Sequence, residues 1–134
     1  MKTIYVLLFA IFCFIIFTSC ISATEPVKKK SPIDAEQINE NLLAGVKSDN
    51  LGLRISSAYY LGEYKVEKAV IPLLNMMHLD KEPAARIQAA LSLIKIGNPK
   101  GVFMVKQAAK FDESKWVRNL CSKFYNAYQR NMVD

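Results

Sequence analysis

The residues best placed to do chemistry in this chain are acidic and basic side chains that recur at a fixed interval. Three aspartates each precede an arginine by five or six residues: Asp49 and Arg54, Asp80 and Arg86, Asp112 and Arg118. The arginines are evenly spaced, 32 residues apart, at positions 54, 86 and 118. We call this constant spacing the repeat interval. A guanidinium can pair with a carboxylate inside the protein, or it can bind an anionic ligand. A period of this length is typical of a stacked repeat array rather than a single globular core.

Other arrangements that support catalysis do not occur in the sequence. The chain has one histidine, His78, so two histidines of one chain cannot share a metal ion. No glycine-rich phosphate loop, nucleophile elbow or paired-cysteine zinc motif occurs. We therefore expect a protein without catalytic residues, cofactor or metal.

The residues around each arginine predict the helices that must position these charges. In the windows 53–58, 85–90 and 117–122, an apolar residue precedes the arginine and two small residues follow three and four positions after it. These spacings place the small residues on one helical face, where they allow close approach of a neighbouring helix. The apolar periodicity predicts six helices, over 33–48, 51–63, 66–79, 83–96, 99–110 and 114–131.

Local signals mark several helix ends. Gly97-Asn98-Pro99 combines a residue that ends a helix, one that can cap the next helix and one that suits its first turn. The segment 31–34 resembles a capping box before the first helix. Pro72 lies inside the helix predicted over 66–79, so it produces a kink there or marks a later start of that helix.

One family is similar in these residues. The pattern Asp80…Arg86-Ile87-Gln88-Ala89-Ala90-Leu91, followed by Ile96-Gly97-Asn98-Pro99, resembles HEAT-like repeats of the short, bilin-lyase type, over roughly residues 36–131. The resemblance implies an all-α, right-handed α-solenoid of about three helical hairpins within a domain spanning 33–134. It also implies a structural ladder, in which each arginine reaches an aspartate of the same or an adjacent unit. Ligand binding by the arginines is the alternative.

The resemblance further implies that the second helices line a concave, partner-binding side. The polar, basic and large apolar residues predicted to contact a partner there are Asn75, Met76, Phe103, Met104, Lys106, Gln107 and Lys110. Core packing between the repeats is the alternative for Met76, Phe103 and Met104. The net charge is +6 and the basic residues are scattered, which favours an acidic protein surface, anionic lipid or a cell-wall polymer as the counterpart. Nucleic acid is not expected, because residues 1–20 have the composition of an export signal and an exported protein rarely meets nucleic acid.

Residues 1–20 have the composition of an export signal. Residues 4–17 are an unbroken apolar run, which is short for a membrane span. Phe17-Thr18-Ser19-Cys20 resembles a bacterial lipobox, so Cys20 is the predicted lipidation site. Cleavage after Ala23 and a retained membrane anchor are the alternatives. Residues 21–32 then form a flexible tether.

Together these features predict a non-catalytic, membrane-anchored lipoprotein of the bacterial envelope that faces the periplasm or the cell exterior. Its expected role is to bind or scaffold another protein. The alternatives are a soluble secreted form, a structural subunit that oligomerises by stacking, and a bilin-lyase-type protein that handles a cofactor.

Overall fold

The computed structural model describes residues 34–132, which fold into six α-helices without any β-strand in that range. The predicted signal peptide, the tether and the lipidation site Cys20 lie outside the described residues. Within 34–132 every helix is too short or too polar to cross a membrane.

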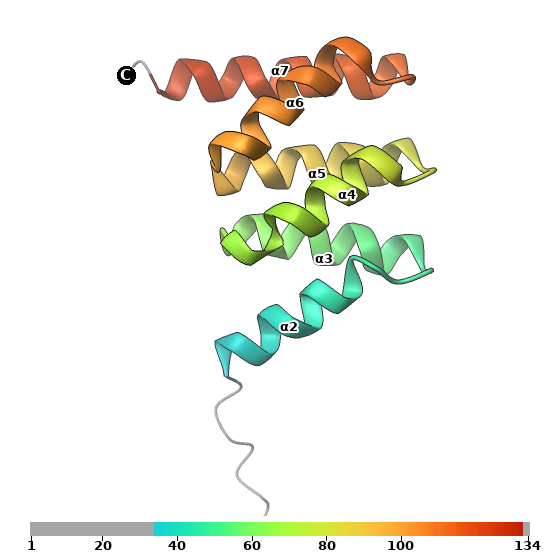
Figure 1. Cartoon of the computed structure of the whole chain (residues 1–134), viewed down its shortest axis with the longest axis vertical. Coiled ribbons are helices and arrows are strands. Elements are labelled where there is room, and N and C mark those ends of the chain that lie inside the picture. Colours follow the sequence, from blue (N-terminus) through green and yellow to red (C-terminus); the bar gives the residue numbers. More distant parts are fainter. Residues whose placement is uncertain (1–33, 133–134) are drawn as a thin grey trace, which may run out of the picture. The chain divides into compact units, whose positions relative to one another are not determined.

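The helices pack in two layers. Their bounds are α2 (Ala35–Gly45), α3 (Leu51–Glu63), α4 (Val70–Leu79), α5 (Pro83–Ile96), α6 (Pro99–Phe111) and α7 (Lys115–Asn131). Helices α3, α5 and α7 lie side by side, with α5 between the other two, whereas α2, α4 and α6 cross them (Figure 1). By contact, α2 pairs with α3, α4 with α5, and α6 with α7. The turn within each pair lies at the same edge of the domain (Figure 1).

Most predicted helix bounds agree with the structure. Two helices match residue for residue, over 51–63 and 83–96, and the last two differ by one residue at one end. The first helix is shorter than predicted at both ends. It begins after Asp34, whose side chain accepts a hydrogen bond from the Glu36 N–H and caps the helix, and it ends at Gly45. Pro72 marks a late start. A 3₁₀ turn (Glu67–Ala69) precedes α4, so Pro72 is the third residue of the helix, where no backbone donor is needed.

The turn between α5 and α6 is built as its sequence predicts. Gly97 ends α5 in the left-handed conformation, with φ at 78°. The side chain of Asn98 then accepts a hydrogen bond from the Lys100 N–H, and Pro99 is the first residue of α6. Both helix ends are therefore satisfied within three consecutive residues.

The core lies where the layers meet, and small residues permit the close approach. Ser57, Ala89 and Cys121 are separated by the repeat interval, and all three are buried. Gly62 lies so close to Ser92 that a Cβ added to the glycine would be 2.8 Å from the Ser92 Cα. Contacts of this kind allow α3 to pack closely against α5.

Candidate binding surface

Arg54 links three segments of the chain through its guanidinium. Its Nη1 donates to the carbonyl oxygens of Ser48 and Asp49, at 2.9 and 3.0 Å. Its Nε and Nη2 donate to the two carboxylate oxygens of Asp80, at 2.7 and 3.1 Å. The side chain thus ties the turn before its own helix to the turn before the next helix of the same layer.

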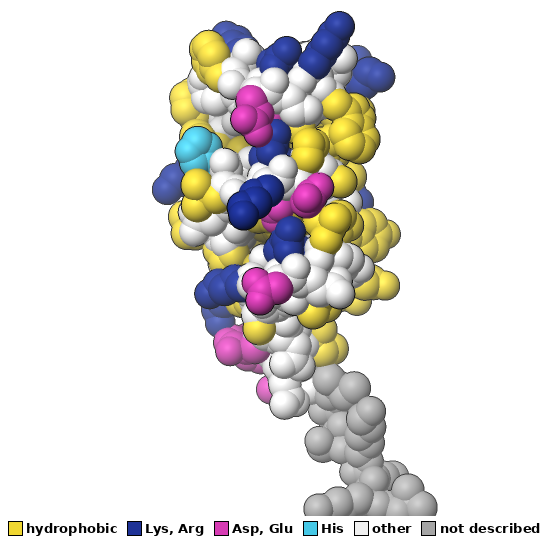
Figure 2. Space-filling view, turned by 90° about the vertical axis from the view of Figure 1, so that its right-hand side faces the viewer, with side chains coloured by type: hydrophobic (Ala, Val, Ile, Leu, Met, Phe, Trp, Pro, Cys, Tyr) yellow, Lys and Arg dark blue, Asp and Glu magenta, His cyan; other side chains and the backbone are white. Residues whose placement is uncertain are grey.

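Arg86 repeats the arrangement one repeat interval later. Its Nη1 donates to the Asp80 carbonyl oxygen at 2.9 Å and, more weakly, to that of Lys81 at 3.5 Å. Its Nε and Nη2 donate to the carboxylate of Asp112 at 3.1 and 3.0 Å, and Nη2 also lies 3.2 Å from a Glu113 carboxylate oxygen. Figure 2, which views the edge that carries these turns, shows acidic and basic side chains alternating down the middle of the face.

Arg118 makes only the first half of these contacts. Its Nη1 donates to the carbonyl oxygens of Asp112 and Glu113, at 2.5 and 3.0 Å. No carboxylate among residues 34–132 pairs with its Nε or Nη2.

The first aspartate of the predicted ladder is corrected by the structure. The residue equivalent to Asp80 and Asp112 is Ser48, one repeat interval before Asp80, and not Asp49. Ser48 Oγ accepts from the Asn50 N–H at 3.1 Å, as the carboxylates of Asp80 and Asp112 accept from the N–H two residues on. Asp49 is one residue out of register and gives Arg54 a main-chain oxygen only. The sequence contains the signal for this assignment, because the repeat interval leads from Asp80 back to Ser48.

The ion pairs are largely removed from water, so their hydrogen bonds must offset the cost of desolvating both charges. Burial raises the pKa of Asp80, but the hydrogen bonds from Arg54 and from the Glu82 N–H outweigh it, so the pKa lies below its ordinary value. The hydrogen bond to Asp112 raises the pKa of Arg86, against the opposing effect of burial. Both groups therefore stay ionised at neutral pH, and their geometry suits a structural role.

A second feature is a row of residues that repeats on α4 and α6, and all of them except the half-buried Gln107 are exposed. We call it the second-helix surface; its members are Ile71, Asn75, Leu79, Phe103, Gln107 and Phe111. The large apolar members form two pairs, each separated by the repeat interval, at 52 and 56% exposed and at 71 and 76% exposed. The spacing of four positions within each helix places each trio on one helical face.

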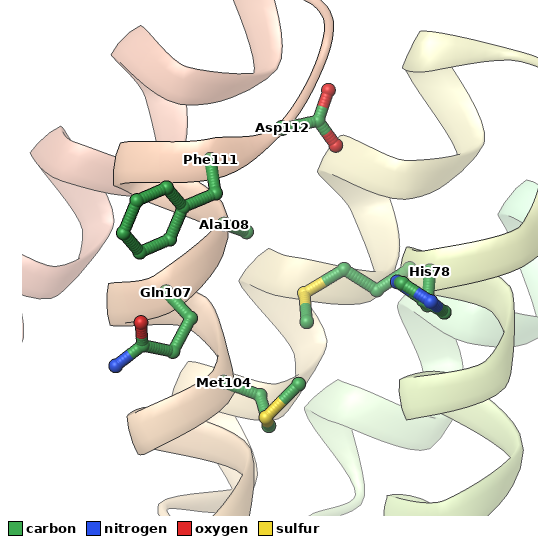
Figure 3. Close-up of a pocket in the computed structure, with 7 residues that line it drawn as sticks. His78, Met104, Gln107, Ala108, Phe111 and Asp112 are labelled. Carbon is green, nitrogen blue, oxygen red and sulfur yellow. The ribbon is translucent and has the colours of Figure 1, made fainter.

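A hollow of about 190 Å³ lies between α4 and α6. Its walls are mostly apolar, and its lining residues are Met77, His78, Met104, Gln107, Ala108, Phe111 and Asp112. In Figure 3, His78 of α4 lies across the gap from Met104 of α6. Two members of the second-helix surface, Gln107 and Phe111, therefore line a concave site that has room for a side chain of a partner.

The predicted partner-contacting residues are distributed unevenly over this region. Asn75, Phe103, Lys106 and Lys110 are exposed, and the Lys106 ammonium lies 5.4 Å from the centre of the Tyr125 ring. Met104 and Gln107 are half-buried and line the hollow.

Met76 is a correction, because only 6% of it is exposed and it packs in the core. The register of α4 directs it inward together with Leu73 and Met77. The sequence interpretation missed Ile71, Leu79 and Phe111. These residues are apolar at equivalent positions of two repeats, which the sequence alone does not distinguish from core positions. The structure distinguishes them, because it shows which apolar residues of α4 and α6 are buried and which are exposed.

Neither Cys121 nor the acidic residues form a reactive site in the described part of the chain. Burial, with a smaller effect of Asp112, raises the pKa of the Cys121 thiol to about 12. It is therefore a protonated packing residue at neutral pH. Residues 34–132 hold no group of three or more histidine, cysteine or acidic side chains arranged to bind a metal ion.

The sequence matches no protein-family profile, and no curated protein is significantly similar to it.

Proposed function

We propose that this protein is a non-catalytic binding module of the HEAT-like type, a right-handed α-solenoid of about three helical hairpins that scaffolds another protein. The repeat interpretation is supported by the two arginines, each of which holds the carboxylate of the following turn. It is also supported by the common placement of the three helix pairs (Figure 1).

The observation that carries the binding role is the second-helix surface. Two pairs of large apolar side chains, Ile71 with Phe103 and Leu79 with Phe111, are exposed at equivalent positions. Phe111 also lines the hollow between α4 and α6. Single exposed apolar residues are common on proteins, but a repeated row beside a concavity is typical of an interaction site. Lys106 and Lys110 on the same helix add positive charge, which favours a partner with an acidic rim.

We further propose that the module works in the bacterial envelope, tethered by lipid at Cys20. The apolar run over 4–17 and the Phe17–Cys20 sequence support this placement. Mass measurement of the mature N-terminus tests it, because an acylated Cys20 differs in mass from a chain that begins after Ala23.

Photocrosslinking tests the binding surface. A photoreactive phenylalanine analogue replaces Phe103 or Phe111 in the producing cell, and Leu53 of α3 serves as a matched control with 50% exposure. We expect one discrete adduct from both second-helix positions and none from position 53. Phe103→Ser with Phe111→Ser should then abolish the interaction with the protein in that adduct, whereas Leu53→Ser should not. The same adduct from all three positions would contradict the proposal.

A further inference from the structure

The last step of the ladder differs from the two before it. In Arg54 and Arg86, Nη1 is held by carbonyl oxygens of the preceding turn, and the edge formed by Nε and Nη2 holds a carboxylate. In Arg118, Nη1 is held by the equivalent carbonyl oxygens. Its other edge has no carboxylate among the described residues.

This arrangement makes Arg118 a preorganised half-site. Two backbone acceptors already hold its guanidinium, so less side-chain entropy is lost when a ligand binds. The same edge in Arg54 and Arg86 binds a carboxylate through two hydrogen bonds of 2.7–3.1 Å. The earlier steps of the ladder therefore show which ligand this geometry accepts.

The outer face of α7 is polar, in contrast to the equivalent face of α3, and it is therefore not suited to an apolar partner. On α3, Ala58 and Gly62 face α5: the Ala58 carbonyl oxygen accepts from Ser92 Oγ at 2.7 Å, and Gly62 touches the same serine. The equivalent residues of α7 are Ser122 and Asn126, both polar.

The charge of this end points the same way. Besides Arg118, helix α7 carries Lys115, Lys123 and Arg130, and no acidic residue occurs from 114 to 132. A stacked second copy would not supply the carboxylate in register, because the residue at that position of the ladder is Ser48. The occupant that fits is therefore an acidic segment of a different protein.

We propose that Arg118 is a binding site for an aspartate or glutamate side chain of an acidic partner protein. That carboxylate takes the place on Arg118 that Asp80 and Asp112 take on Arg54 and Arg86. The site is on α7, and its test uses no residue of the second-helix surface.

Arginine side-chain NMR on the unaltered protein tests the site directly. The protein is expressed from its full-length sequence, kept in mild detergent, and titrated at constant ionic strength with a short blocked peptide of alternating aspartate and glutamate. We expect the Nε–Hε resonance of Arg118 to shift, while those of Arg54 and Arg86 stay in place because their edges are occupied. The corresponding peptide of asparagine and glutamine should cause no shift. Equal shifts of all three resonances, or none, would overturn the proposal.

Variants separate the paired geometry from general charge. Arg118→Lys keeps the charge but loses the planar fork, and we expect it to weaken peptide binding about tenfold, as should Arg118→Gln. Lys123→Gln removes one charge from the same helix and should weaken binding less than about twofold. Circular dichroism checks that each variant is folded.

Two further outcomes count against the proposal. If Arg118→Gln and Lys123→Gln weaken peptide binding equally, the peptide is attracted by the overall positive charge of α7 and not by a specific site at Arg118. If inorganic phosphate or phosphatidylglycerol vesicles shift the Arg118 resonance more than the peptide does, the site binds phosphate rather than a protein carboxylate.

Discussion

Arg54 and Arg86 decide how the turns of this protein are held, because each guanidinium serves two purposes at once. One nitrogen satisfies carbonyl oxygens that precede the helix, and the opposite edge holds a carboxylate of the following turn. Lysine could not do both, since it lacks the planar fork. Within residues 34–132 every buried side-chain nitrogen and oxygen has a hydrogen-bond partner. The ladder thus buries charge without leaving polar groups unsatisfied.

Asp80→Asn should make the protein less stable at neutral pH but not in acid. The pKa of Asp80 is lower in the folded protein than its ordinary value, so its ionised form stabilises the fold above about pH 4, and this contribution is lost as the pH falls through the folded pKa. We expect the variant to lose about 2 kcal/mol at pH 7, and the difference from the unaltered protein to narrow below about pH 4.

Urea unfolding at a series of pH values measures this difference. Asp49→Asn is the matched control: its carboxylate is exposed and out of register, so the free energy of unfolding should change by less than about 0.5 kcal/mol. A loss in Asp80→Asn that is the same at every pH would show that the carboxylate charge is not what matters.

At the scale of the helices, two equivalent turns each contain a residue with positive φ, but the residue types differ. Gly97 follows α5 with φ at 78°, and Lys65, one repeat interval earlier, has φ at 48°. The Val66 N–H reaches back to the Leu61 carbonyl oxygen at 3.0 Å, which closes the end of α3. A side chain with a Cβ is strained in this left-handed region, whereas glycine is not. The turn after α3 therefore stores strain that the turn after α5 avoids.

Lys65→Gly should relieve that strain and raise the free energy of unfolding by about 1 kcal/mol, somewhat reduced by the greater freedom of glycine in the unfolded chain. The reciprocal change, Gly97→Lys, should lower it by a similar amount. A Cβ at position 97 would meet open space, so the cost of this change reports the backbone conformation alone. Chemical denaturation of both variants gives the comparison. Destabilisation by Lys65→Gly would mean that the lysine side chain contributes more than its backbone strain costs.

For the whole domain, the outer face of α7 decides whether a further helical unit can pack against this end. Residues of α3 and α5 that face the next helix of their layer are apolar or small, and the equivalent residues of α7 are polar. The equivalent sets are Ile55, Ile87 and Asn119; Ala58, Ala90 and Ser122; Gly62, Ile94 and Asn126. A polar outer face is typical of a capping unit in a repeat protein. This composition favours a capped binder over the stacking subunit that the sequence also allowed.

Asn119→Ile, Ser122→Ala and Asn126→Ile together should therefore turn the protein into one that self-associates. The triple change restores on α7 the apolar face that α5 presents, and hydrophobic burial then drives end-to-end contact. Sedimentation velocity over a range of concentrations measures it. A control triple, Asn119→Gln, Ser122→Thr and Asn126→Gln, keeps the face polar and should sediment like the unaltered protein. Open-ended oligomers of the unaltered protein would instead support stacking.

Features that depend on neighbouring residues were predictable. The ends of α3 and α5, and the caps at Gly97 and Asn98, follow from local backbone preferences that act over a short stretch of chain. The buried small residues at 57, 89 and 121 follow from helical spacing. The short α2 and the late start of α4 were less predictable, because capping and proline signals there allow more than one boundary.

By itself, the sequence determined the all-helical class, the approximate helix boundaries and the equivalence of the three arginines. The tertiary structure decided that the carboxylate of each ion pair comes from the following turn. It also decided that Ser48 and not Asp49 begins the ladder, and that Met76 is buried while Phe111 is exposed. The physical reason is that ion pairs and burial depend on how helices approach one another. That approach is set by contacts summed over the whole domain, whereas helix formation and capping are governed by residues within one turn.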